Sequence, residues 1–318
     1  MTQPLVAVLL PTYNQAAFVA DAVLSAVEQD YPNLRVVVCD DGSTDGTVEV
    51  IRSLQARYPG RIVAIVDEPH LGLTGNCNRN LRACVATGAT YVAFHAGDDI
   101  WLPGKITRQV EWLEADPRRV LCSHDVEVFD SDTNARLFLW SEQHQPARGS
   151  DPALFVSRWP AWHPLGNVVR ASVLPPGGYD ERVPIASDFK FFVHCVARGG
   201  EVGDIPGVFA RYRQWAGNAS AYRPKMWSDL FNTLDLIAAE YPSVADACRS
   251  YRALSLYQHG RELLYRGDAA GGRACLMRAL RERPWSSRTV PALLAVIAPT
   301  HLTYWAVALR RRLRSSAP

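Results

Sequence analysis

The 318-residue sequence lacks the short motifs that identify many nucleotide-binding and hydrolytic enzymes. No Gly-x-Gly-x-x-Gly follows the first apolar segment, and no Gly-x-x-x-x-Gly-Lys-Ser/Thr occurs anywhere in the chain. Dinucleotide-binding loops and Walker-type phosphate loops are therefore not indicated. The Gly-x-Ser-x-Gly sequence of a nucleophile elbow is also absent, so the sequence does not predict a serine hydrolase.

Metal-binding cysteine pairs and an export signal are lacking as well. The seven cysteines include no Cys-x-x-Cys pair, which argues against a zinc site or a disulfide framework. Residues 1–4 carry no basic flank, and the apolar run of residues 5–10 is too short for the core of a signal peptide. We therefore expect a protein of the reducing cytoplasm whose cysteines are small buried side chains.

Positive charge is concentrated at the carboxyl end, although the net charge of the chain is only +2. Residues 261–318 contain eleven arginines and three acids, a charge of +8, which leaves −6 for residues 1–260. Residues 289–309 carry no charge, and Pro291 and Pro299 argue against one straight helix there. Three interpretations remain open: helices lying on an anionic membrane face, packing on the protein itself, and a membrane span.

The first 130 residues alternate between strand-like and helix-like patterns. Helical spacing over residues 18–29 and 76–86, and a helix that starts after Ser43, separate four apolar strand segments. These segments are Leu5–Leu10, Leu34–Cys39, Ile62–Val66 and Tyr91–His95. The alternation predicts an α/β fold with a mostly parallel, doubly wound sheet. Residues 120–222 show short apolar runs typical of an α+β half, and residues 225–288 have helical spacing.

Two acidic pairs stand at the ends of predicted strands. Asp40 and Asp41 end the second strand, and Asp98 and Asp99 follow the fourth. Because open α/β sheets bind ligands beyond the carboxyl ends of their strands, the two pairs are expected to face one site. One pair is suited to read a nucleotide, and the other to hold a divalent metal on its phosphates. A calcium loop starting at Asp41 is excluded, because its twelfth position is Arg52 instead of Glu.

Four segments together resemble the family 2 glycosyltransferases, which are inverting enzymes of the Rossmann-like GT-A fold that use nucleotide sugars. The segments are Val8–Asn14, Val38–Asp45, Gly72–Asn80 and Gly97–Asp99. The resemblance covers about residues 5–222. It implies a divalent metal, Mg²⁺ or Mn²⁺, on Asp99, and a nucleoside-diphosphate donor, with UDP expected before GDP or dTDP. The residues it assigns to the nucleotide are Pro11, Thr12, Asn14, Asp40, Arg79 and Asp98.

The second half of the chain also matches family patterns. Asp188 stands where the resemblance implies a catalytic base; the alternative is that Ser187 or Asp188 only caps a helix. The segment 212–220 resembles a family segment in which Trp215 replaces the usual His. Arg213 or the Trp215 indole is then expected at the diphosphate as part of a lid, unless the indole stacks on a sugar. Trp162 and His163 are expected to border the acceptor site.

These observations predict a metal-dependent inverting glycosyltransferase that acts on a hydroxyl of a glycan or lipid-linked acceptor, with no nucleic acid as partner. Residues 1–222 would form the catalytic domain, and residues 223–318 a helical extension with a basic, membrane-associating tail. Two alternatives remain. A sugar-nucleotide pyrophosphorylase carries a Gly-rich, basic loop after the first strand, which Pro11–Gln15 does not match. A non-catalytic scaffold protein of the same fold would not need the acids at 40, 98, 99 and 188.

Overall fold

A computed structural model describes residues 3–184, 186–218 and 223–284 of the chain. The chain divides into two compact units, Met1–Thr233 and Leu234–Pro318, which are described separately. The tail for which a membrane contact is predicted, residues 285–314, lies outside the described residues. Among the described residues, no helix is long and apolar enough to cross a membrane.

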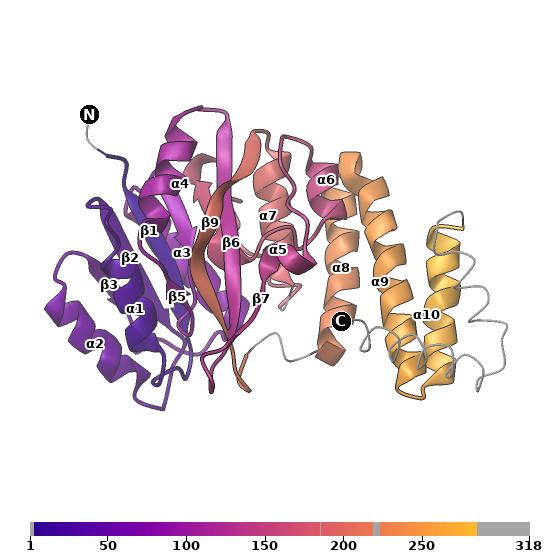
Figure 1. Ribbon diagram of the computed structural model, residues 1–318, viewed down its shortest axis with the longest axis horizontal. Helices are drawn as coiled ribbons and strands as arrows, with labels where there is room; N and C mark the ends of the chain where they lie inside the picture. Colours follow the sequence, from indigo (N-terminus) through magenta and orange to yellow (C-terminus); the bar gives the residue numbers. More distant parts are fainter. Residues whose placement is uncertain (1–2, 185, 219–222, 285–318) are drawn as a thin grey trace. The chain divides into compact units, whose positions relative to one another are not determined.

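The first unit is built on one sheet, in which the described residues form nine strands (Figure 1). Eight of them follow the order β3-β2-β1-β4-β8-β6-β9-β5, and β7 pairs with β6. Strands β1 to β4, β6 and β9 run in one direction, and β5, β7 and β8 run in the other. The prediction of a mostly parallel sheet is therefore confirmed. The strands are β1 Val6–Thr12, β2 Leu34–Asp40, β3 Ile62–Ile65, β4 Tyr91–Phe94, β5 Ile100–Trp101, β6 Arg119–Asp130, β7 Arg136–Leu139, β8 Val168–Arg170 and β9 Glu201–Gln214.

Helices cover both faces of this sheet, as a doubly wound fold requires. Helices α1 (Val19–Val27), α2 (Thr47–Arg57) and α4 (Lys105–Glu114) share one core cluster with alternate residues of β1 and β2. On the opposite face lie α3 (Gly72–Ala86) and α7 (Ser187–Ala197). There Phe94 of β4 contacts the rings of Phe191 and Phe192 from α7. Helix α3 begins four residues earlier than the spacing predicts.

Short elements carry the chain from β6 to α7. They are α5 (Trp140–Gln143), α6 (Pro152–Ser157) and the 3₁₀ turns η1 (Pro164–Gly166) and η2 (Ala171–Val173). The long strand β9 was not recognisable as one strand in the sequence. Pro206 and Gly207 interrupt its apolar pattern, and its register against β6 shifts between Ser123 and Val126. Bulges of this kind tolerate residues that a regular strand excludes.

The second unit is helical, in agreement with the periodicity. Helix α8 (Arg223–Glu240) contains the division between the units, and η4 (Pro242–Val244), α9 (Ala245–Tyr265) and α10 (Ala269–Glu282) follow. Helices α9 and α10 form a hairpin around Leu264 and Leu276. The Asp268 carboxylate caps α10 by accepting a hydrogen bond from the Gly271 N–H at 2.9 Å.

Candidate active site at the carboxyl edge of the sheet

The loops that follow β1, β2 and β4 start side by side because their strands pair in parallel. Thr12 lies opposite Asp40 in the β1–β2 ladder, and Leu9 lies opposite Phe94 in the β1–β4 ladder. The two acidic pairs predicted to share one edge of the sheet therefore follow β2 and β4, the two strands that flank β1. This edge is the usual ligand-binding edge of an open α/β sheet.

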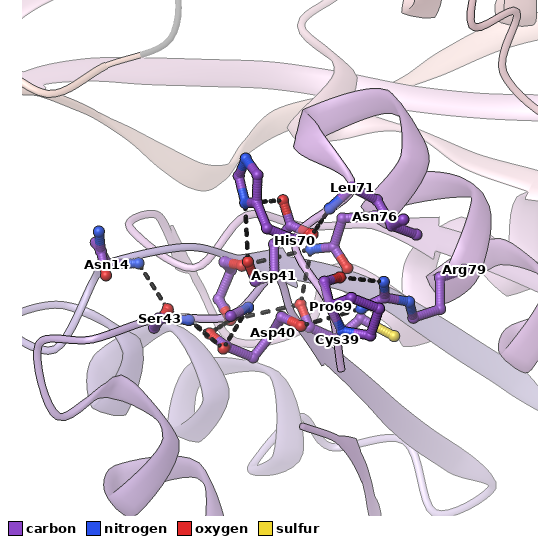
Figure 2. A network of polar contacts seen from close by, with 12 residues as sticks. Asn14, Cys39, Asp40, Asp41, Ser43, Pro69, His70, Leu71, Asn76 and Arg79 are labelled. Carbon is purple, nitrogen blue, oxygen red and sulfur yellow. Dashed lines mark hydrogen bonds and ion pairs between the residues drawn. The ribbon is translucent and has the colours of Figure 1, made fainter. Parts of the chain in front are cut away.

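The Asp40 carboxylate is fully engaged within the protein. Its Oδ1 accepts hydrogen bonds from the N–H groups of Gly42 (3.1 Å) and Ser43 (2.8 Å). Its Oδ2 accepts from the hydroxyls of Ser43 (2.5 Å) and Thr12 (3.1 Å). The residue is completely buried, and Figure 2 shows its carboxylate beside Ser43. Asp40 and Thr12 thus shape the loop, and the nucleotide contacts expected of them stay predictions.

The β1–α1 loop is tied to the β2–α2 loop by a second set of hydrogen bonds. The Asn14 N–H donates to Ser43 Oγ at 2.7 Å, and Asn14 Oδ1 accepts from the Thr44 N–H at 2.9 Å. The Ala16 N–H donates to Asp45 Oδ2 at 3.0 Å. Asn14 itself has a φ of 50°, a backbone conformation that asparagine tolerates better than most residues. Its side chain joins the two loops, and its predicted nucleotide contact stays a prediction.

A second cluster lies beside Asp40 and joins Asp41 to His70 and Tyr13, two residues for which the sequence predicts no role at the site. Asp41 Oδ1 accepts the Leu71 N–H at 2.8 Å, and Asp41 Oδ2 lies 3.0 Å from His70 Nδ1. The Tyr13 ring, about half exposed, packs 4.9 Å from the His70 ring. Asp41 thereby fixes the start of α3, with its carboxylate beside His70 and Leu71 (Figure 2). The exposed Tyr13 and His70 rings offer an aromatic surface next to it.

Side chains of helix α3 form hydrogen bonds with the backbone of the same loops. The Arg79 guanidinium donates to the backbone carbonyls of Asp40 (3.4 Å) and Pro69 (2.7 Å). The Asn76 amide donates to the Cys39 carbonyl at 3.0 Å, while its buried Oδ1 has no hydrogen-bond partner. Arg79 is therefore engaged with the protein backbone, and its predicted contact with the nucleotide stays a prediction.

The acidic pair after β4 is buried with little compensating charge. Burial and the neighbouring Asp98 carboxylate raise the pKa of Asp99 well above its usual value. Burial also raises the pKa of Asp98, although a hydrogen bond from Trp215 partly offsets this rise. Glycine at position 97 lets the segment after β4 lie close to Thr12 of β1, because a Cβ there would lie 2.5 Å from Thr12 Cγ2.

These surroundings fit a divalent cation. No cluster of three or more potential metal-ligating side chains exists in the described part of the chain. Mg²⁺ and similar ions need only one or two carboxylates when substrate phosphates complete their coordination. A cation would also supply the positive charge that the buried Asp98 and Asp99 lack. Asp99 and Asp98 are thus the residues suited to hold a metal, and the metal role expected of Asp99 stays a prediction.

The end of β9 reaches this acidic pair. The Arg213 N–H donates to Asp99 Oδ1 (2.9 Å), and its guanidinium Nε donates to the Asp98 carbonyl (2.7 Å). The Arg213 guanidinium lies between the rings of Phe18 and Phe129. The Trp215 indole N–H donates to Asp98 Oδ2 at 2.8 Å. Both side chains therefore contact the acids, while their predicted roles at the diphosphate stay predictions.

Asp188 lies in the first turn of α7, and the N-cap of that helix is Ala186 without a side-chain cap. Asp188 Oδ1 accepts the N–H of Phe189 at 2.8 Å. Burial raises the pKa of Asp188 to about 6. The Ser187 hydroxyl lies 3.3 Å from the Thr74 hydroxyl of α3, the helix that begins beside Asp41. The helix start predicted here is present, and its acid has the pKa of a general base for neutral pH.

Trp162 and His163 precede η1 in a group of aromatic side chains. The His163 ring packs 4.2 Å from Tyr212 and 4.8 Å from Trp140, and burial lowers its pKa to about 3. The Trp162 side chain is buried, and its indole N–H has no hydrogen-bond partner. His163 is thus a neutral, packed side chain, and an acceptor contact for either residue stays a prediction.

Comparisons with known proteins agree with this architecture. The family model of Glycosyl transferase family 2 matches residues 7–160. A Bacillus subtilis (strain 168) protein named as a glycosyltransferase, EpsE, is 33% identical over 40% of this chain and 45% of its own length. The Escherichia coli UDP-Glc:alpha-D-GlcNAc-diphosphoundecaprenol beta-1,3-glucosyltransferase WfaP is 33% identical over 35% of this chain and 42% of its own length. The matched region thus spans less than half the length of these relatives.

Solved structures share the fold at low identity. S. aureus TarS, also solved with UDP, superimposes with a TM-score of 0.65 and 16% identity over 97% of this chain and 91% of its own. The Pyrobaculum calidifontis mannosyltransferase PcManGT, solved with GDP-Man and Mn²⁺, gives a TM-score of 0.58 and 20% identity, covering 100% and 89% of the two chains. These two likenesses concern the fold alone. Together with the match of residues 7–160 to the family model, they support a family 2 glycosyltransferase with a GT-A-like fold.

Proposed function

We propose that this protein transfers a sugar from a nucleoside-diphosphate sugar to a hydroxyl group of an acceptor, with inversion at the sugar C1. The observation that carries the proposal is that the acids of the site lie in two different environments. Asp98 and Asp99 are a buried pair suited to a cation, and Asp188 is a separate carboxyl whose pKa of about 6 suits proton transfer at neutral pH.

In this mechanism Asp188 takes the proton from the acceptor hydroxyl. The acceptor oxygen then attacks C1 in line, and the nucleoside diphosphate departs from the opposite side. One displacement inverts the anomeric configuration, and no second carboxylate is needed as a nucleophile. Asp98 and Asp99 hold the site for Mg²⁺ or Mn²⁺, which supplies positive charge to the diphosphate when bound. Tyr13 and His70 provide rings against which a nucleobase can stack.

The names of the compared proteins guide the choice of substrates. TarS was solved with UDP and PcManGT with GDP-Man and Mn²⁺, so we place UDP first among donors and GDP and dTDP next. WfaP is named for a diphosphoundecaprenol-linked acceptor. We therefore propose a glycan or lipid-linked acceptor, bordered by Trp162 and His163, for a polysaccharide-building reaction.

The basic end of the chain suggests where the reaction takes place. The eleven arginines of residues 261–318 and the charge-free stretch 289–309 favour peripheral binding to the anionic inner face of a cytoplasmic membrane. In this proposal residues 1–222 form the catalytic domain, and residues 223–318 form the extension that brings it to a lipid-linked acceptor.

A ligand panel tests the proposed reaction. UDP, GDP, dTDP and CDP are added to the full chain with Mn²⁺ or Mg²⁺, since a preferential ligand of the folded state raises its melting temperature. One nucleotide should stabilise the protein, only with metal, and Asp99→Ala should remain folded while losing most of this effect. The matching nucleotide sugar should then release nucleoside diphosphate on incubation with acceptor. Binding that is unchanged in EDTA would contradict the metal site, and absence of all nucleotide binding would favour a scaffold protein.

A further inference from the structure

Residues at the end of strand β9 form hydrogen bonds with both Asp98 and Asp99, which lie more than a hundred residues earlier in the chain. Arg213 binds Asp99 through its backbone N–H and the Asp98 carbonyl through its side chain. The Trp215 indole then donates to the Asp98 carboxylate at 2.8 Å. Pairing of β5 with β9 holds the residues that follow the pair, because Ile100 lies opposite Arg211.

The segment that carries Trp215 is itself closed by internal contacts. The buried Asn218 accepts the Trp215 backbone N–H at 2.5 Å through Oδ1 and donates to the Arg213 carbonyl at 2.9 Å. The indole covers Gly217 so closely that a Cβ there would lie 2.2 Å from the ring. The centre of the Phe18 ring lies 5.1 Å from the centre of the indole, and the two rings pack edge to face. The indole therefore has a fixed place and direction.

We propose that Trp215 is a positioning residue that orients the Asp98 carboxylate for the nucleotide, and that it does not itself bind the diphosphate. The proposal rests on the proposed function, since it assigns the way in which that site is kept in order. The indole N–H donates to one carboxylate oxygen of Asp98, Oδ2, and so sets the direction of this carboxylate. A hydrogen bond to a carboxylate is stronger than one between neutral groups, so it fixes the rotamer of Asp98 effectively.

The choice of tryptophan has a chemical consequence. An indole N–H only donates, whereas a histidine in its place would present a donor or an acceptor depending on its tautomer. Trp215 therefore gives Asp98 the same partner whether or not a nucleotide is bound. The Phe18 ring packs against the indole, and Asn218 holds the backbone of Trp215.

Three variants of the full chain test this role. Trp215→Phe keeps a ring but loses the donor, and Trp215→His restores a donor. Trp112→Phe is the control, because Trp112 packs beneath Arg119 and Gly203, away from the acids. With UDP and Mn²⁺ as probe, calorimetry should show affinity about tenfold weaker for Trp215→Phe, the usual worth of one charge-assisted hydrogen bond. Trp215→His should recover most of it, and the control should bind as the wild type does.

A double-mutant cycle separates positioning from simple stabilisation of the fold. If Trp215 acts through Asp98, Trp215→Phe should weaken binding little further in an Asp98→Asn background. Independent, multiplying effects would overturn the proposal, and so would unchanged affinity of Trp215→Phe. Wild-type protein that binds none of the nucleotides would instead refute the proposed function.

One measurement remains decisive if Trp215→Phe does not fold. The NMR signal of the Trp215 indole N–H is assigned by its loss in Trp215→His. It should move in Asp98→Asn, because the acceptor changes from a carboxylate to an amide. A signal that stays in place in this variant would show that the indole does not depend on Asp98.

Discussion

At the scale of single residues, the surroundings of each carboxyl group decide what it can do. Asp40 has four hydrogen-bond donors around its two oxygens, so it is a building element of its loop. Asp98 and Asp99 are buried next to each other, and burial raises both pKa values more than Arg213 lowers them. Asp188 is half-buried at the start of α7, and burial raises its pKa to about 6, so it can exchange a proton near that pH.

Replacement of Asp188 by Asn should lower turnover at least ~10²-fold, the usual contribution of a general base, while nucleotide binding stays intact. The wild-type rate should fall as the pH drops through about 6, because Asp188 then takes up a proton and can no longer accept one. Rates measured at saturating donor from pH 5 to 8 give both results. Asp116→Asn, which removes a carboxylate paired with Arg118 between α4 and β6, is the control and should keep near-normal turnover. Near-normal turnover of Asp188→Asn would refute its role as base.

Lys105 of α4 is the most unusual charge in the core. It is completely buried, its Nζ donates to Gln109 Oε1 at 2.7 Å, and it lies 4.6 Å from the centre of the Trp101 ring. None of these partners is an acid. Burial consequently lowers the pKa of Lys105 to about 7.

This lysine should make stability depend on pH. The unfolded chain keeps the Lys105 proton up to its ordinary pKa near ~10.4, whereas the folded chain releases it above about 7. The unfolded state therefore binds more protons in this window, and stability should rise with pH. Urea unfolding at pH 7.0, 7.75 and 8.5 measures it. The unfolding free energy of wild type minus that of Lys105→Met should increase by up to ~1.4 kcal/mol for each unit by which the pH rises. A constant difference between the two proteins would contradict the prediction.

At the scale of elements, the position of Asp188 depends on contacts between α3 and the loop before α7. Asn78 of α3 is buried, accepts the Tyr179 N–H at 2.7 Å and donates to the Tyr179 carbonyl at 3.0 Å. A Cβ on Gly178 would lie 2.3 Å from Asn78 Oδ1, and Gly178 has a φ of +72°. The Asn78 side chain thus forms the two backbone hydrogen bonds that a neighbouring strand would form with this loop.

Asn78→Ala should therefore destabilise the first unit by ~1–3 kcal/mol, because it leaves buried backbone groups of Tyr179 without partners. It should also lower turnover more than donor affinity, since it loosens the loop that leads to Asp188. Urea unfolding and steady-state kinetics measure the two effects. Asn33→Ala removes an exposed amide that donates to the Gln3 carbonyl, and should change stability by less than ~0.5 kcal/mol. Equal stability of the two variants would show that the link between α3 and the loop is dispensable.

At the scale of the whole molecule, local sequence patterns predicted the first half of the sheet. The remaining structure depends on contacts between residues far apart in the chain. The apolar strands and helical spacing before residue 130 are local, so the doubly wound sheet followed from them. His70 had no such signal, because its partner Asp41 lies 29 residues away. The resemblance singled out Trp215, but its contact with Asp98 spans 117 residues and was not predicted. The acids were visible at their strand ends, whereas the side chains that orient them become apparent only in three dimensions.

The last prediction concerns the basic end of the chain, of which residues 285–318 lie outside the described part. Arg288, Arg310, Arg311, Arg312 and Arg314 stand there without any acid. Each basic residue near an anionic surface contributes ~1 kcal/mol at most, so together they should hold the protein reversibly. Full-length protein should pellet with anionic vesicles at low salt and be released as salt screens the charges, whereas a chain ending at Arg283 should stay in solution.

A charge variant separates the two forces expected at this membrane contact. Replacing the four arginines after residue 309 by Gln keeps the apolar stretch 289–309 intact. This variant should lose its preference for anionic over neutral vesicles, while residual binding to both reports burial of apolar side chains. Co-sedimentation at two salt concentrations gives both quantities. Equal pelleting of the full chain and the truncated chain would mean that the tail packs on its own protein or on a partner chain.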